Sequence, residues 1–144
     1  MNPLEEGREL KLDFAKIAKI ADRRGDVIPV AIQNADTREV ILVAYTNETA
    51  FRKTMETRNL VLWSTSRNEL WEKGKTSGET FEVIEASVNC EQNSLLYKVR
   101  PRRAPGTGAR VGGICHTKNR VGEPRDCYYR RINFDSLALE NLDP

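Results

Sequence analysis

At 144 residues the chain is long enough for one domain of ordinary size, and nothing in its length requires a second. It has no basic, apolar leader and no apolar run of bilayer length, which argues against a secreted or membrane-spanning protein, so we expect a cytoplasmic one. Cytoplasmic thiols stay reduced, so the odd count of three cysteines favours metal binding, catalysis or burial over disulfides.

The net charge of +2 conceals an uneven distribution. Residues 98–131 hold ten basic and two acidic side chains, a charge of +8, whereas the rest of the chain carries −6. A local positive field favours an anionic ligand, such as one with phosphates. A solvated basic loop explains the pattern equally well, and both interpretations stay open.

The first predicted element is an amphipathic helix. Apolar side chains recur there at helical spacing: Leu10, Phe14, Ile17, Ala18 and Ala21. Gly25 follows at the position where a left-handed residue would end the helix. Residues 1–26 are therefore assigned to an N-terminal helical segment.

A hairpin and a second helix follow. Apolar runs at 27–33 and 40–45 flank a turn-like Asn-Ala-Asp-Thr sequence, which predicts two antiparallel strands. Asn47 can then cap a helix from Glu48 to about Thr57.

Short strands dominate the remaining sequence. Apolar or alternating runs predict strands at 60–64, 70–73, 81–88, 95–99 and 128–134. Residues 101–113 are rich in proline, glycine and arginine and are expected to form a loop, and a capped turn is expected near residue 135. The prediction is an α+β domain over residues 27–134, with mostly antiparallel short strands and two helices in the chain, and a tail over 135–144.

Two cysteines and the only histidine lie in neighbouring motifs. Cys115 and His116 are adjacent, Cys127 follows a basic loop, and Cys90 ends a predicted strand. Thiolate and imidazole are the ligands that a soft divalent metal needs. Plain burial explains Cys90 equally well. Cys115 and Cys127 flank a loop with no obvious core, which favours a metal there.

Three cysteine ligands are typical of a catalytic zinc site, because they leave a fourth position for water, whereas a structural site has four protein ligands. Water bound to zinc can ionise near neutral pH and attack an electron-poor carbon. Histidine is the residue type whose unperturbed pKa lies near neutrality, and His116 adjoins a candidate ligand, so it is the candidate acid/base; a surface histidine is the alternative. Purine deaminases use similar zinc chemistry.

Four motifs occur between about Val27 and Arg131. They are Glu39-Val-Ile-Leu-Val-Ala-Tyr45, Trp63-Ser-Thr-Ser-Arg67, Glu69-Leu-Trp-Glu-Lys-Gly-Lys-Thr-Ser-Gly78, and Cys115-His-Thr with Cys127-Tyr-Tyr-Arg130. In content and order they resemble the phosphoribosyl-AMP cyclohydrolases of histidine biosynthesis. The resemblance implies a zinc-dependent hydrolase that opens the adenine ring of phosphoribosyl-AMP between N1 and C6.

The resemblance also implies an intertwined homodimer with shared metal sites. Cys90 of one subunit would hold zinc together with Cys115 and Cys127 of the other, and His116 matches the catalytic histidine. The tract 63–78 matches residues that line the substrate pocket, which makes these the contact candidates: Arg67, Trp71, Lys73, Thr76 and Ser77. The same tract also fits a stiff hairpin with an aromatic anchor.

The sequence departs from the family in an acidic motif. The family carries Asp-Cys-Asp-x-Asp, whose carboxylates bind magnesium, whereas this chain has Asn89-Cys90-Glu91-Gln92-Asn93. Magnesium prefers charged oxygens, so we expect a working zinc site and a degenerate magnesium site at Asn89, Glu91 and Asn93. The connections 98–113 and 116–127 are longer than usual, and Thr65 replaces a family arginine.

Three functions stay open. The first is a cyclohydrolase whose added arginines bind the phosphates of a purine nucleotide. The second is a paralogue that uses the same zinc-activated water on another purine-like or cyclic amidine substrate. The third is a non-catalytic, zinc-stapled module for RNA or another phosphate polymer; it is disfavoured because aromatic and basic residues do not alternate as base-stacking surfaces require.

Overall fold

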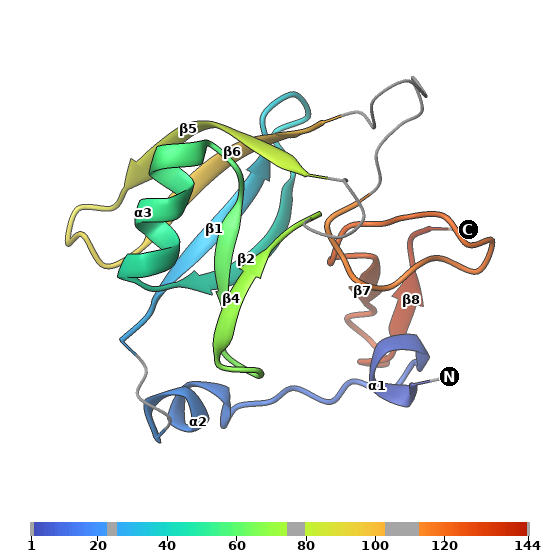
Figure 1. Ribbon diagram of the computed structural model, residues 1–144. Coiled ribbons are helices and arrows are strands. Elements are labelled where there is room, and N and C mark those ends of the chain that lie inside the picture. The colour runs from blue at the N-terminus through green and yellow to red at the C-terminus, as the bar shows by residue number, and fades with distance from the viewer. Residues whose placement is uncertain (1, 23–25, 75–79, 103–112, 144) are drawn as a thin grey trace.

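A curled six-stranded sheet forms the larger part of the molecule (Figure 1). The computed structural model describes residues 2–22, 26–74, 80–102 and 113–143. The strand order is β4-β3-β2-β1-β6-β5, and every neighbouring pair is antiparallel except β1 with β6. The predicted α+β class with mostly antiparallel strands is therefore confirmed.

The strands follow the predicted hydrophobic runs closely. Their bounds are β1 Ile28–Asn34, β2 Val40–Thr46, β3 Val61–Ser64, β4 Glu69–Glu72, β5 Phe81–Val88 and β6 Leu95–Pro101. The turn between β1 and β2 is closed by Asn34, whose Oδ1 accepts hydrogen bonds from the N–H groups of Asp36 and Thr37 at 2.8 and 3.0 Å.

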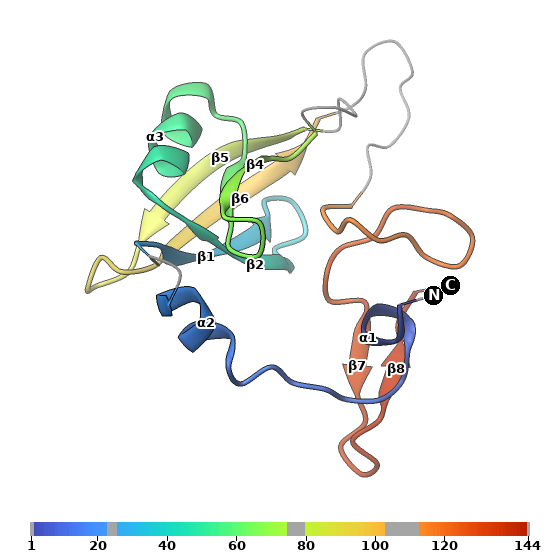
Figure 2. The ribbon, with the colours of Figure 1, turned by 60° about the horizontal axis from the view of Figure 1, so that its bottom comes forward.

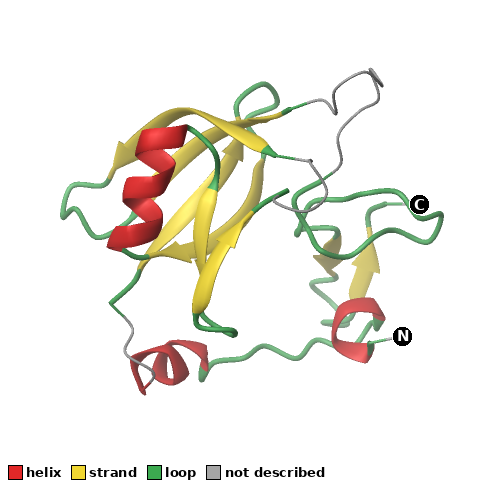
Figure 3. Ribbon diagram, in the orientation of Figure 1, coloured by secondary structure: helices red, strands yellow, loops and turns green. Residues whose placement is uncertain are grey.

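Helix α3, Glu48–Thr57, crosses one face of the sheet (Figure 3). It begins as predicted, because the Asn47 side chain accepts a hydrogen bond from the Ala50 N–H at 2.9 Å. The buried Thr54 hydroxyl donates to the Val61 carbonyl at 2.9 Å and accepts from the Val61 N–H at 3.1 Å. These two bonds fasten α3 to β3.

One apolar core lies inside the curl of the sheet. Its buried members are Val30, Ile32, Ile41, Leu60, Leu62, Phe81, Val83, Tyr97, Val99 and Ile114. The Leu60 N–H donates to the Phe81 carbonyl at 3.1 Å and the Val83 N–H to the Arg58 carbonyl at 2.8 Å. The edge strand β5 thus bonds to the residues before β3, which nearly closes the curl.

The N-terminal helix is shorter than predicted. Helix α2 spans Lys16–Asp22, and a separate short helix α1 spans Pro3–Glu6. The Asp13 carboxylate accepts a hydrogen bond from the Ala15 N–H at 3.1 Å, so the backbone turns into the helix only after Asp13. Residues 10–15 were wrongly included in the helix, because the prediction followed the apolar spacing and did not take Asp13 as a capping residue.

Large apolar side chains in α2 and just before it lie exposed in the single chain. Ile20 is buried, whereas Phe14 is 91% exposed and Ile17 64% exposed. The predicted helix end at Gly25 lies outside the described residues. No helix that the structure describes is long and apolar enough to cross a bilayer.

A second, two-stranded sheet pairs β7, Arg130–Ile132, with β8, Leu139–Asn141. Only a turn was predicted near residue 135, so β8 was missed. The N-terminal segment packs against this hairpin, since the Leu139 N–H donates to the Arg8 carbonyl at 2.8 Å. Figures 1 and 2 both show the two chain ends on this side of the molecule.

Candidate functional site

Two loop segments carry Cys115 and Cys127 and lie side by side. The Cys115 N–H donates to the Arg125 carbonyl at 3.0 Å, and the Ile114 N–H donates to the Asp126 carboxylate at 3.0 Å. Ile114 is fully buried in the core. The cysteine loops are therefore anchored to the sheet and to each other.

Gly113 permits this close approach. A Cβ at position 113 would lie 2.1 Å from the carbonyl carbon and oxygen of Arg125, a separation that no side chain allows. The Cys127 N–H donates to the Ile41 carbonyl of β2 at 3.1 Å, which fastens the second segment to the sheet.

The intervening residues form a self-contained loop. The Asn119 side chain accepts hydrogen bonds from the N–H groups of Val121 and Glu123 at 3.1 and 2.8 Å. Lys118 and Pro124 pair across the base of the loop. The long connection 116–127 therefore folds back on itself, so that Cys127 lies next to Cys115.

Cys115 and Cys127 form a hydrogen-bonded pair of half-buried, free thiols. The hydrogen bond from Cys127 lowers the pKa of Cys115 to about 5, and the same interaction raises the pKa of Cys127. Thr117 supports the Cys115 sulfur with its hydroxyl at 3.0 Å and its N–H at 3.5 Å. One of the two sulfurs is thus an anionic, soft donor near neutral pH.

The buried guanidinium of Arg125 is linked to the thiol pair through Thr117. The Arg125 side chain is 4% exposed and forms ion pairs with Glu6 at 3.1 Å and Asp143 at 3.5 Å. Its Nε donates to Thr117 Oγ1 at 3.0 Å. Because that oxygen already accepts a hydrogen bond from Arg125, its proton can point to the Cys115 sulfur.

Cys90 lies far from this pair within one chain. It is exposed in the turn after β5, which Figure 2 places at the opposite side of the molecule from the loop of residues 113–129. Among the described residues, no three Cys, His, Asp or Glu side chains gather at one point. Within one chain, two of the three predicted sulfur ligands therefore lie together, and Cys90 lies apart from them.

A hollow of about 560 Å³ lies beside the cysteine loops. Its walls contain three aromatic rings, two cationic side chains and the histidine: Tyr45, Trp63, Trp71, Lys16, Arg67 and His116. Flat aromatic faces suit a purine ring, and the two cations suit phosphates. His116 faces this hollow from the loop that carries Cys115.

Three of the predicted site residues, Arg67, Trp71 and His116, therefore come together. Lys73 lies near the thiol pair instead, where its positive charge acts to lower the pKa of Cys127. Thr76 and Ser77 lie outside the described residues.

Sequence reasoning missed Lys16 and Tyr45. Lys16 looks like an ordinary polar residue of an N-terminal helix, and only the folded chain brings it to Arg67. Tyr45 ends one of the four motifs, which is the signal that could have identified it.

The sequence model of the phosphoribosyl-AMP cyclohydrolase family matches residues 42–129, more than half of the chain. The chain belongs to this family. A Caulobacter vibrioides phosphoribosyl-AMP cyclohydrolase is 45% identical over 136 residues, which cover 94% of this chain and 87% of the relative. Homologues of the same name from Hyphomonas neptunium (43% identical, 82% of this chain and 79% of the relative) and Halobacterium salinarum (35%, 94% of each) are also similar.

Residues 89–93, where the resemblance led us to expect a degenerate magnesium site, form a turn held together by its own side chains. Asn89 Oδ1 accepts hydrogen bonds from the N–H groups of Asn93 and Ser94, both at 2.9 Å, and the Asn89 amide donates to Asn93 Oδ1 at 2.7 Å. The Asn93 amide donates in turn to Glu91 at 3.3 Å. One side-chain oxygen at each of these three positions is thus engaged within the turn.

Many of the basic residues in segment 98–131 are paired with acids elsewhere in the chain. The ion pairs join Lys98 to Glu85, Arg100 to Asp36, Arg125 to Glu6 and Arg131 to Glu140. Arg103 and Arg110 lie outside the described residues. The cations that line the hollow, Lys16 and Arg67, belong to other segments, so among the described residues the basic segment adds no Lys or Arg to its wall.

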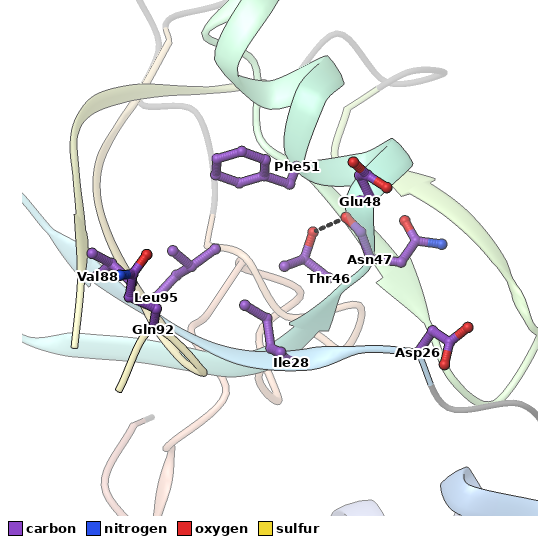
Figure 4. Close-up of a pocket in the computed structure, with 9 residues that line it drawn as sticks. All are labelled: Asp26, Ile28, Thr46, Asn47, Glu48, Phe51, Val88, Gln92 and Leu95. Carbon is purple, nitrogen blue, oxygen red and sulfur yellow. Dashed lines mark hydrogen bonds between the residues drawn. The ribbon is translucent and has the colours of Figure 1, made fainter. Parts of the chain in front are cut away.

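A second hollow, of about 430 Å³, lies between the start of α3 and the end of β5 (Figure 4). Its walls are mainly apolar: Ile28, Phe51, Val88 and Leu95. Its charged lining residues are Asp26 and Glu48, whose carboxylates would repel a phosphate. The hollow beside His116 is therefore the better nucleotide site.

Proposed function

We propose that this chain hydrolyses phosphoribosyl-AMP in histidine biosynthesis. Water adds to C6 of the adenine ring, the bond from N1 to C6 breaks, C6 becomes the carbonyl carbon of a carboxamide, and N1 takes up a proton. The observation that carries the proposal is the hollow that gathers Trp71, Arg67 and His116 beside the Cys115–Cys127 pair, in a chain of this family.

Substrate binding would use the aromatic and cationic walls of the hollow. Trp63, Trp71 and Tyr45 offer faces on which the purine can stack. The substrate has a phosphate on each of its two ribosyl groups, and Lys16 and Arg67 supply one positive charge each. Arg67 pairs with Glu69 at 3.5 Å, but an exposed pair of this kind is weak and can give way to a phosphate.

The donor set fits zinc. Cys115 and Cys127 offer two adjoining soft sulfurs, one of them ionised near neutral pH, and we propose that Cys90 of a second chain completes the set. When bound, the metal supplies the activation of water that ring opening requires. His116 adjoins Cys115 and lines the hollow, so it takes up or returns the proton of the reaction.

By the same argument we propose a homodimer, because the turn that carries Cys90 lies on the opposite side of its own chain from the loop of residues 113–129. Exposed apolar side chains support the dimer: Val88, two residues before Cys90, is 53% exposed, and Phe14 of the N-terminal segment is 91% exposed. Three free thiols suit a reducing compartment such as the cytoplasm.

The test is a ring-opening assay on phosphoribosyl-AMP with metal content measured on the same sample. We expect about one zinc per chain, activity that is lost with zinc, and activity that survives removal of magnesium, since the amides of the 89–93 turn replace the acidic cluster. His116→Ala should retain zinc and lose at least ~100-fold in rate. Near-normal turnover in that variant would remove the histidine from the mechanism, and strict dependence on magnesium would contradict the degenerate site.

Shared sites can be tested by coexpressing two inactive variants, Cys90→Ser and Cys127→Ser. A mixed dimer would contain one site with all three sulfurs, so roughly a quarter of the wild-type activity should return in a random mixture of symmetric dimers. If all three ligands came from one chain, coexpression would restore nothing.

A further inference from the structure

We infer that Glu5 is a positioning residue that holds the His116 imidazole in the orientation and tautomer needed for proton transfer. This inference rests on the acid/base role proposed above for His116. It adds to the site a residue that lies 111 positions earlier in the sequence.

The contact is direct and short. His116 Nε2 lies 2.8 Å from Glu5 Oε1. A carboxylate oxygen accepts, so Nε2 must carry the proton, and the lone pair of a neutral ring then lies on Nδ1. Nδ1 is thereby assigned as the atom that takes up and returns a proton. The His116 side chain is 75% exposed, so few other contacts restrain its rotation.

Glu5 is itself held in place. The Tyr129 hydroxyl donates to the Glu5 carbonyl at 2.8 Å, and the Arg130 guanidinium donates to the carbonyls of Leu4 and Gly7, both at 3.0 Å. The neighbouring Glu6 pairs with buried Arg125 at 3.1 Å. Four contacts from one short stretch of chain thus fix α1 against the loop that carries the histidine.

The family sequence model matches residues 42–129, so it assigns no role to α1. In this chain, however, two consecutive acids of α1 point to two parts of the same site. Glu6 reaches the guanidinium that supports Thr117 and Cys115, and Glu5 reaches the imidazole. Helix α1 thereby helps to position both the His116 imidazole and the Cys115–Cys127 pair.

The test compares Glu5→Gln with Glu9→Gln, a matched control in the same segment whose carboxylate is 77% exposed and pairs only loosely with Lys11 at 3.6 Å. Both are made in the zinc-loaded, full-length protein. Glu5→Gln should lower kcat by about 10–100-fold, the range for residues that orient a functional group, with KM and zinc content unchanged. Glu9→Gln should behave as wild type, and Glu5→Asp should recover part of the loss.

The chain has a single histidine, so ¹⁵N NMR of the imidazole reports on this residue alone. At a pH where the ring is neutral, the wild type and Glu9→Gln should show the Nε2–H tautomer, and Glu5→Gln a mixture of tautomers. A wild-type rate or an unchanged tautomer in Glu5→Gln would overturn the inference. So would a rate loss accompanied by loss of zinc, because the role would then be structural.

The inference and the proposed function fail differently. If His116→Ala keeps its rate, the histidine has no catalytic role and the inference falls with it. If His116→Ala is inactive while Glu5→Gln has a normal kcat and tautomer, the hydrolase stands and only the role of Glu5 is lost.

Discussion

Thr117 connects the buried Arg125 guanidinium to the sulfur of Cys115, a proposed zinc ligand, because its hydroxyl contacts both side chains. Partners of this kind orient a ligand without touching the metal. Such a role cannot be read from the sequence. The residue types at Cys115, His116 and Cys127 pointed to metal and proton chemistry, but a threonine beside them is unremarkable until its neighbours are known.

Thr117→Val keeps the shape of the side chain and removes the hydrogen bond to sulfur. We expect zinc affinity to fall by about 10–100-fold, as for other residues that support a metal ligand. Competition with a chromophoric chelator measures this change. Thr117→Ser, which keeps the hydroxyl, should bind zinc nearly as well as the wild type. A zinc affinity of Thr117→Val equal to that of the wild type would show that the hydroxyl does not contribute to zinc binding.

At the scale of elements, the sequence predicted a helix or strand correctly where both its apolar pattern and its end residues could be recognised. The cap of α3 was readable because Asn47 precedes a helical pattern, and the bounds of β5 were readable because its apolar residues alternate and one end packs into the core. The predicted N-terminal helix began too early, because the apolar spacing continues across Asp13, the residue after which the helix begins. Strand β8 was missed because its side chains are mostly exposed and its partner, β7, is only three residues long.

Removing the cap should weaken α3 specifically. Asn47→Ala deletes the side-chain oxygen that accepts from the Ala50 N–H, and we expect a loss of about 1 kcal/mol in the free energy of unfolding. Urea denaturation gives the value. Asn47→Asp retains an acceptor and should remain close to the wild type; equal losses in both variants would point to a role other than capping.

At the scale of the whole molecule, the arrangement of strands depends on pairings distant in sequence. The parallel contact of β1 with β6 joins segments about sixty residues apart, and no local pattern predicts it. The same reasoning applies to the site. Composition indicated sulfur ligands and a basic segment. Only the fold shows that many of the basic residues form ion pairs with acidic residues of the same chain. Only the fold shows that Lys16 and Glu5 reach the site from the N-terminal segment.

The core makes a prediction about alkaline stability. Tyr97 is fully buried, no described residue accepts from its hydroxyl, and burial raises its pKa to about 12. The folded protein therefore keeps the phenol proton at pH values where the unfolded chain, with a pKa near 10, releases it. The stabilisation is present below pH 10 and is lost as the pH rises through 12, a change of roughly 2–3 kcal/mol.

Tyr97→Phe provides the comparison for that measurement. Unfolding free energies of the wild type and the variant, measured in urea from pH 8 to the highest pH at which both fold, should converge or cross as the pH rises. Curves that stay parallel throughout would mean that the phenol is not shielded as the fold indicates.

Arg125 draws Glu6 and Asp143 toward the same guanidinium, which places both ends of the chain next to the cysteine loops. This has a practical consequence for handling the protein. A polyhistidine tag on either end would bring foreign imidazoles near Cys115 and Cys127, where they would compete with the proposed sulfur ligands for zinc. Metal stoichiometry and histidine spectroscopy should therefore be carried out only after such a tag has been cleaved away.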